Sequence, residues 1–241
     1  DGEKAEAARP ILERHRRAGA RVVYAEQGAV RCAQGDEVTT LVAVDELPIT
    51  FGGVARYNVE NVLGVVAMAR ALGLPDAAIV RGLRGFGMAD NPGRGDIIER
   101  GGVRIMLDFG HNPEGVRAVM KLVTTLRQPG GRLVVVAGSA GDRSDHEIEG
   151  MSRAIAEAKP DLVLVRDLGG YLRGRLPGDV PRVFERSLVA CGFPREAVRR
   201  VDSEVAALEH VRATGRPGDF VILLVHLDRE EVRAFLDAWK D

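Results

Sequence analysis

The distribution of apolar residues changes near residue 92, and the two parts of the chain predict different folds. In the first part, apolar positions with helical spacing predict helices over 3–18, 58–72 and 75–84. Pro10 falls inside the first of these and predicts a kink or a break there. A short strand is predicted at 21–26, and short apolar runs separated by turn residues predict strands that pair as antiparallel hairpins at 30–32, 38–44 and 47–51.

Beyond residue 92, strands and helices alternate regularly. Strands are predicted at 96–100, 103–108, 132–137, 161–166, 197–201 and 220–225, and helices at 114–127, 146–158, 180–191, 203–214 and 228–239. This alternation predicts an α/β fold, a Rossmann-like and mainly parallel sheet with helices on both sides. Such sheets bind ligands beyond the carboxyl ends of their strands. We therefore expect the chemistry in the loops at 108–113, 138–145, 166–175 and 226–229.

The stretch 85–93 is rich in glycine and proline and has the composition of a linker, so we place a domain boundary at residue 92. A chain of 241 residues is long enough for two modest domains, and 45% hydrophobic residues are enough for a sizeable core. The net charge of −1 argues against nucleic acid as a partner.

The two cysteines are far apart and have no metal-type spacing, which favours a reduced, intracellular protein. No apolar stretch approaches the ~18–20 residues that a membrane span needs, and no signal peptide precedes the first helix, so the cytoplasm is the expected location. We expect no membrane partner and no bound metal held by this chain, since no metal-binding motif occurs. Oligomeric state is left open.

Residues 108–113, Asp-Phe-Gly-His-Asn-Pro, are the most informative segment because they end a predicted buried strand and begin a helix. Asp108 at a strand end is suited to bind a ribose diol. Asn112 lies near the helix N-cap and Pro113 suits the first turn. The alternative is that these polar side chains only order the turn.

Three further segments carry polar side chains at ligand-binding positions. Arg94 follows Pro-Gly in the linker, where a guanidinium can swing onto a phosphate. The glycine-rich loop 138–145 contains Asp142 and Arg143, and its alternative role is a simple turn capped by Ser144 or Asp145. Arg173 and Arg175, between glycines, suit the recognition of a carboxylate-bearing substrate.

The segment 108–113 resembles the Asp-Tyr-Ala-His-Asn-Pro sequence that opens the C-terminal domain of the Mur ligase family. These ATP-dependent, amide-forming enzymes include muramyl-peptide ligases, folylpolyglutamate synthetase and cyanophycin synthetase. The resemblance implies that Asp108 contacts the ribose and that His111 and Asn112 lie beside the nucleotide. It also implies that Arg94 reaches the terminal phosphate, and that Asn61 of an Asn-x-x-Asn segment faces the adenine. Arg94 and His111 are thus the catalytic candidates.

The two arginine-containing loops are most similar to those of cyanophycin synthetase. Its Gly-Asp-Arg loop lies near the acceptor substrate, and it carries a comparable Arg-Gly-Arg-Pro run. The resemblance therefore implies that Asp142, Arg143, Arg173 and Arg175 bind an amino-acid or peptide substrate. His226 and Asp228 match the corresponding Mur ligase segment only in part.

The chain contains no Gly-x-x-x-x-Gly-Lys-Ser/Thr loop, which the Mur ligases carry in their central domain. We therefore expect residues 1–92 to be the distal part of a P-loop ATPase domain, and residues 93–241 a Mur ligase C-terminal domain. The implied cofactors are ATP and Mg²⁺, with the magnesium ligands outside this chain. The chain alone is then expected to be inactive.

The resemblance implies a reaction in which a carboxylate attacks the γ-phosphate of ATP and an amine captures the acyl phosphate, giving an amide. One alternative is a Rossmann oxidoreductase, which predicts a Gly-x-Gly-x-x-Gly that residues 108–115 lack. The other alternative is a stand-alone nucleotide-binding or scaffold module without catalysis.

Overall fold

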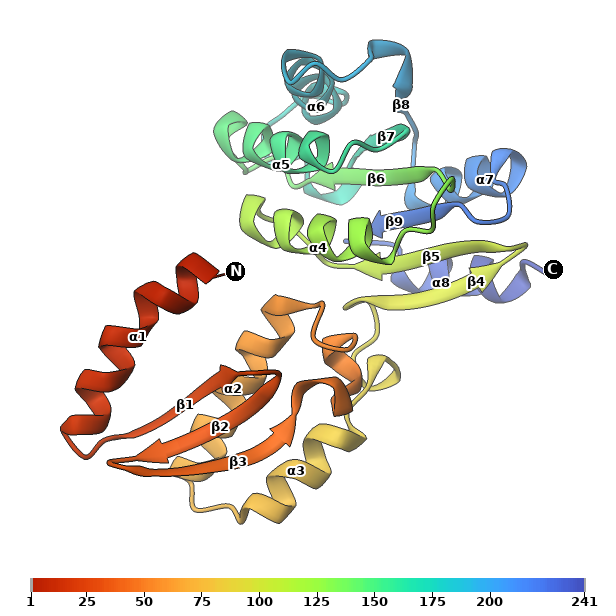
Figure 1. Ribbon diagram of the computed structural model, residues 1–241. Helices are drawn as coiled ribbons and strands as arrows, with labels where there is room; N and C mark the ends of the chain where they lie inside the picture. Colours follow the sequence, from red (N-terminus) through yellow and green to blue (C-terminus); the bar gives the residue numbers. More distant parts are fainter. Residues whose placement is uncertain (1, 241) are drawn as a thin grey trace. The chain divides into compact units, whose positions relative to one another are not determined.

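The structure is a computed structural model that describes residues 2–240, with the side chains of residues 8–88 and 90–240 placed. The chain divides into two compact units, Asp1–Asp90 and Asn91–Asp241. Figure 1 shows the first unit in red to yellow and the second in yellow to blue. No helix among the described residues is both long and apolar enough to cross a membrane.

The first unit contains an antiparallel three-stranded sheet with the order β1–β2–β3, in which the pairing of β2 with β3 confirms a predicted hairpin. Its strands and helices are α1 (Gly2–Arg17), β1 (Arg21–Glu26), β2 (Ala29–Gln34), β3 (Glu37–Ala43), α2 (Arg56–Ala71) and α3 (Asp76–Gly85). Gln27 and Gly28 both have positive φ, which suits a two-residue hairpin turn between twisted strands. Apolar residues of β2, β3, α2 and α3 pack into one core.

The predicted strand at 47–51 is wrong, and of the kink or break predicted at Pro10 no break occurs. The helix α1 continues through Pro10 as one element, because a proline removes a single N–H bond while its neighbours keep theirs. Residues 47–51 do not form a strand, because Pro48–Thr50 form the short 3₁₀ turn η2, directly after the 3₁₀ turn η1 (Val44–Glu46). Pro48 has no N–H to offer a neighbouring strand, and the Thr50 hydroxyl lies 2.7 Å from the carbonyl oxygen of Val44. A third 3₁₀ turn, η3 (Met88–Asp90), ends the unit.

The second unit has the predicted mainly parallel, Rossmann-like sheet, with strand order β4–β5–β9–β6–β7–β8. Only β4 runs antiparallel to its neighbour. The elements are β4 (Asp96–Arg100), β5 (Val103–Asp108), α4 (Pro113–Leu126), β6 (Leu133–Ser139), α5 (Asp145–Glu157), β7 (Leu162–Asp167), η4 (Gly169–Tyr171), α6 (Asp179–Ala190), η5 (Arg195–Ala197), β8 (Val198–Arg200), α7 (Glu204–Thr214), β9 (Phe220–Leu224) and α8 (Arg229–Ala238).

Helices cover both faces of this sheet. The helices α7 and α8 pack against one face, where alternate residues of β5, β6 and β9 point. The helices α4, α5 and α6 lie side by side over the other face (Figure 1). All five residues of β9 are buried, since this strand lies between β5 and β6 in the middle of the sheet. The last strand in the sequence therefore occupies the centre of the sheet.

The carboxyl ends of the parallel strands lie along one edge of the sheet. Strand β5 ends at Asp108, β6 at Ser139 and β7 at Asp167, and each is followed by a loop that leads into a helix or a 3₁₀ turn. The loop after β9 joins the same edge, because Asp108 pairs with Leu224 in the parallel register. This edge carries the predicted site residues of the second unit.

Ile222 at the centre of β9 is fully buried, and its truncation tests the packing of this sheet. We expect Ile222→Ala to lower the free energy of unfolding by about 2–5 kcal/mol, through lost burial and a residual cavity. Urea unfolding measures the loss, with Val189→Ala on the exposed surface of α6 as a control that changes stability little. A loss below about 1 kcal/mol for Ile222→Ala would contradict the buried central position of β9.

Candidate functional site

Asp108 is a buried carboxylate at the end of β5, with a relative exposure of 5%. Its Oδ1 accepts a hydrogen bond from the backbone N–H of Gly110 at 2.9 Å. Burial raises the pKa of Asp108 to about 6, although the Gly110 N–H and the positive charge of Arg94 act in the opposite direction. The carboxylate is thus held in place at an energetic cost, because desolvation disfavours its charged form.

The Phe109 ring next to it is surrounded by cationic and imidazole groups. The guanidinium carbon of Arg94 lies 4.9 Å from the ring centroid, and that of Arg229 lies 5.0 Å from it. The imidazole rings of His111 and His226 lie 5.1 and 5.4 Å from the same ring. Among residues 8–88 and 90–240, neither Arg94 nor Arg229 has a carboxylate partner within ion-pair distance. The structure therefore gathers two available guanidiniums beside the strand end.

The turn after Phe109 is built by its own polar side chains. The Oδ1 of Asn112 accepts from the N–H of Gly115 at 2.8 Å and caps α4, and Pro113 occupies the first helical position. The Nδ1 of His111 lies 3.3 Å from the carbonyl oxygen of Phe109. The predicted cap at Asn112 is confirmed, so the side-chain oxygen of Asn112 already has a structural role. Contact of His111 or Asn112 with a nucleotide stays a prediction.

A buried carboxylate that the sequence did not single out fixes the loop after β9. Glu204, the first residue of α7, has no solvent exposure and pairs with the equally buried Arg166 of β7. Its Oε1 accepts from the N–H of His226 at 2.7 Å, and its Oε2 accepts from that of Asp228 at 2.9 Å. In the sequence, Glu204 follows Ser203 and resembles an ordinary first-turn acid, so only its fully buried position reveals this role.

His226 joins this loop to the turn after β5, because its Nε2 lies 3.2 Å from the carbonyl oxygen of Gly110. Burial and the nearby charge of Arg166 lower the pKa of His226 to about 4. The imidazole is therefore neutral near pH 7 and donates from Nε2 to Gly110. Its Nδ1 is buried and has no hydrogen-bond partner among the described residues.

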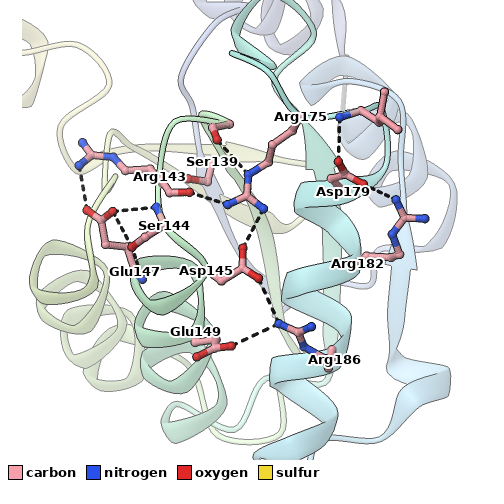
Figure 2. A network of polar contacts seen from close by, with 12 residues as sticks. Ser139, Arg143, Ser144, Asp145, Glu147, Glu149, Arg175, Asp179, Arg182 and Arg186 are labelled. Atoms are coloured by element: carbon pink, nitrogen blue, oxygen red, sulfur yellow. Dashed lines mark hydrogen bonds and ion pairs between the residues drawn. The ribbon is translucent and has the colours of Figure 1, made fainter.

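The predicted substrate loops at 138–145 and 166–175 pack against each other (Figure 2). Arg175 donates from Nε to the carbonyl oxygen of Gly141 at 2.9 Å and from Nη2 to that of Arg143 at 2.6 Å. A Cβ on Gly141 would lie 1.9 Å from the carbonyl oxygen of Leu172, so only glycine permits this approach. Ser144 and Glu147 form a capping box at the start of α5.

The four predicted substrate residues lie together at this edge of the sheet, but they differ in what holds them. Arg175 has its remaining Nη1 paired with Asp145 at 2.8 Å, so all its nitrogens already bond the neighbouring loop. Arg173 pairs with Asp142, and both side chains are about half exposed. The Arg173–Asp142 pair is accessible to a substrate, whereas Arg175 supports the loop.

A groove of about 650 Å³ lies alongside α6, away from Asp108. Its wall contains the arginines 175, 182, 186, 195 and 200. Each of these guanidiniums lies within ion-pair distance of Asp145, Glu149, Asp179 or Glu185. Because the acidic partners already neutralise the arginines, we place the candidate nucleotide site at the end of β5 rather than in this groove.

The remaining candidate, Asn61, belongs to the first unit and lies in α2. Its Nδ2 donates to the Oδ1 of Asn58 at 3.3 Å. Asn58 in turn donates to the carbonyl oxygen of Ile49 at 2.8 Å and braces the 3₁₀ turns that precede α2. The contact of Asn61 with adenine stays a prediction.

A sheet of this topology, with polar side chains along its carboxyl edge, defines a ligand-binding α/β domain. The family described as Mur ligase, glutamate ligase domain, matches residues 93–224, which is more than half of the chain. The chain belongs to this family.

Relatives include the cyanophycin synthetase of Synechocystis sp., 28% identical over 75% of this chain and 20% of its own length. The UDP-N-acetylmuramate–L-alanine ligase of Phenylobacterium zucineum is 32% identical over 76% of this chain and 37% of its own length. The chain thus spans about a fifth of the first relative and little more than a third of the second.

Solved structures show the same fold. The FolC protein of E. coli in complex with DHPP and ADP aligns with a TM-score of 0.64 at 19% identity, over 90% of this chain and 45% of that one. A murein peptide ligase from Psychrobacter arcticus aligns with a TM-score of 0.61 at 14% identity, over 89% of this chain and 43% of that one. At these identities the likeness concerns the fold alone.

The raised pKa of Asp108 makes a prediction about stability and pH. The native state keeps this proton up to about pH 6, while an unfolded aspartate loses it near 4, so the contribution of Asp108 to stability falls as pH rises through this range. We expect Asp108→Asn to match the wild type near pH 4 and to be more stable by about 3 kcal/mol at pH 7. Urea unfolding at intervals between these values measures the difference.

The comparison must be made between variant and wild type, because His226 contributes with the opposite sign. Because the pKa of His226 is lowered, stability is lost as pH falls from about 6.5 towards 4. The wild type and Asp108→Asn share this loss, so it cancels in their difference. A stability difference that does not change with pH would show that Asp108 is not held in a desolvated position.

Proposed function

We propose that this chain is the distal part of an ATP-dependent ligase that joins a carboxylic acid to an amino acid or peptide through an acyl phosphate. The observation that carries the proposal is the arrangement at the end of β5 in a member of the Mur ligase family. The buried carboxylate of Asp108 lies close enough to Arg94 to feel its positive charge, while the Arg94 guanidinium forms no ion pair at contact distance among the described residues. A nucleotide needs a hydrogen-bond acceptor for its sugar hydroxyls and a positive charge for its phosphates, and Asp108 and Arg94 are of these two kinds.

The Asp108 carboxylate is suited to the nucleoside. Two hydroxyls of a ribose are hydrogen-bond donors, and an ionised carboxylate only accepts. Bonds from the ribose would stabilise the charged form of Asp108, which its buried position otherwise disfavours. A ligand that donates hydrogen bonds would therefore stabilise the ionised form of Asp108. His111, in the same turn, would lie beside the nucleotide.

Arg94 would bind the terminal phosphate and stabilise the negative charge that develops during transfer. It lies in the segment that opens the second unit, between Gly93 and Gly95, both of which have positive φ. Its guanidinium contacts Phe109 rather than a carboxylate, so a phosphate does not have to displace an internal partner. This is positioning and electrostatic catalysis.

The loops at 138–145 and 166–175 would orient the incoming amine substrate. The exposed pair of Arg173 and Asp142 offers one group for a carboxylate and one for an ammonium. Arg175 would act through the loop, by holding the carbonyl groups of Gly141 and Arg143. Arg143 itself pairs with Glu147 at 3.0 Å, and a substrate that recruits it must displace that carboxylate.

We assign residues 1–92 to the distal part of the central ATPase domain and residues 93–241 to the C-terminal domain of such a ligase. ATP and Mg²⁺ would be its cofactors, with the metal ligands and the P-loop lysine supplied from outside these residues. The FolC structure, which shares this fold, was solved in complex with ADP, and this supports a nucleotide as the ligand. We also propose that Asn61 contacts the adenine.

Calorimetric titration of the 241-residue chain tests the nucleotide assignment. We expect ADP to bind and NAD not to bind, and we expect Asp108→Ala to weaken adenosine binding about 10-fold by removing a charged hydrogen-bond acceptor. Asp161→Asn, at the opposite edge of the sheet, is the matched control and should leave binding unchanged. Binding of NAD with no binding of ADP would support an oxidoreductase and overturn the ligase assignment.

We also expect no ATP turnover from this chain alone, because the phosphate-holding loop and magnesium ligands of the family are not within it. A phosphate-release assay with ATP and Mg²⁺ measures this. Magnesium-dependent turnover by the purified chain, retained after removal of contaminating ATPases, would show that the catalytic machinery is complete here.

A further inference from the structure

We propose that Arg229 is a second phosphate-binding residue, which forms a two-guanidinium clamp with Arg94 across Phe109. This inference rests on the proposed function and adds a residue to that site. Both guanidinium carbons lie about equally far from the Phe109 ring centroid, at 4.9 Å for Arg94 and 5.0 Å for Arg229. The Arg229 guanidinium also lies against the backbone next to Arg94, because a Cβ built on Gly93 would be 3.9 Å from its guanidinium carbon.

The charges at this position are available to a ligand. Among residues 8–88 and 90–240, Arg229 has no ion-pair partner, whereas the arginines along the α6 groove are all paired. Stacking on an aromatic ring holds a guanidinium in a fixed orientation but leaves its N–H edge free to donate. A planar group with several donors is well matched to the oxygens of a phosphate.

Arg229 lies at the N-terminus of a helix, where backbone N–H groups favour an anion. Arg229 is the first helical residue of α8, and the preceding Asp228 makes no side-chain cap there. A positive charge at a helix N-terminus opposes the macrodipole, whereas Glu230 and Glu231 in the same first turn complement it. An anion bound by Arg94 and Arg229 would be favoured by the helix end and by both guanidiniums.

The loop that carries Arg229 is fixed before any ligand arrives. The buried Glu204 accepts from the backbone N–H groups of His226 and Asp228 and is itself paired with Arg166. His226 then bonds the carbonyl oxygen of Gly110 in the turn that carries Phe109. The two sides of the clamp are thus joined through a buried network, and little ordering is needed on binding.

A phosphate fits this arrangement better than a substrate carboxylate does. Two guanidiniums supply two positive charges and more donors than a single carboxylate can accept in bidentate geometry. The clamp also lies beside Asp108, the proposed ribose ligand, so nucleoside and phosphate would occupy neighbouring positions. The loops with Arg173 and Asp142 remain for the carboxylate-bearing substrate.

The test is calorimetric titration of the full chain at low ionic strength with ADP, inorganic tripolyphosphate, adenosine and L-glutamate. We expect Arg229→Gln and Arg94→Gln each to weaken ADP and tripolyphosphate about 10-fold, by loss of a charge-assisted contact. Adenosine binding should not change, and Arg229→Lys should restore part of the lost affinity. The matched control is Arg212→Gln, since Arg212 stacks on Phe235 at 4.8 Å in the same way but outside the site.

Three results would overturn the clamp. The first is wild-type affinity of Arg229→Gln for both phosphate ligands, and the second is an equal loss of adenosine binding, which shows that the substitution only disturbs the fold. The third is weakened L-glutamate binding with unchanged tripolyphosphate. If Arg94→Gln weakens ADP while Arg229→Gln does not, the proposed function stands and only the clamp falls. If the wild type binds neither ADP nor tripolyphosphate, both fall.

Discussion

The carboxyl edge of the parallel sheet depends on the buried pair of Glu204 and Arg166. Neither side chain reaches solvent, and the removal of one partner from such a pair costs about 3–5 kcal/mol because a buried charge is left uncompensated. Glu204 uses its remaining acceptor capacity on the backbone of the loop after β9. That loop contains His226, which bonds the turn after β5. One buried carboxylate therefore sets the relative position of two loops that come from strands far apart in the sequence.

Asp108 is a second buried carboxylate, and it lies at the candidate site itself. An apolar residue at the end of β5 would avoid the desolvation that raises the pKa of this carboxyl to about 6. The chain keeps the carboxylate and surrounds it with a backbone N–H and the positive charge of Arg94. A perturbed acid in a cluster of cations beyond a strand end is the arrangement expected of a functional site rather than of a structural turn.

Much of the second unit could be predicted from the sequence, because unbroken apolar runs such as 220–225 and the regular alternation with helices allow few other folds. The Asn112 cap was predictable for a related reason, since capping is local chemistry. The 3₁₀ turns at 44–50 were not, because the Thr50 hydroxyl and Pro48 override an apolar pattern that is too short to specify a strand.

The candidate site was predictable only where its residues lie in short motifs. Asp108 and His111 occur in one hexapeptide, and Arg94 follows a Pro-Gly pair. Glu204, Arg166 and Arg229 could not be found this way, because their roles arise from contacts between residues tens of positions apart. The loop at 226–229 was expected to carry chemistry, but nothing in its sequence distinguishes Arg229 from the other arginines of the chain.

The central claim is that a nucleotide binds at the end of β5, and backbone amide NMR during an ADP titration tests it most directly. The account predicts that the largest ADP-induced shifts in the second unit occur at Gly95, at residues 109–112 and at residues 226–229, with the amides lining the α6 groove unaffected. Shifts that are concentrated at Arg182, Arg186 and Arg200 instead, with none at Gly110, would contradict it.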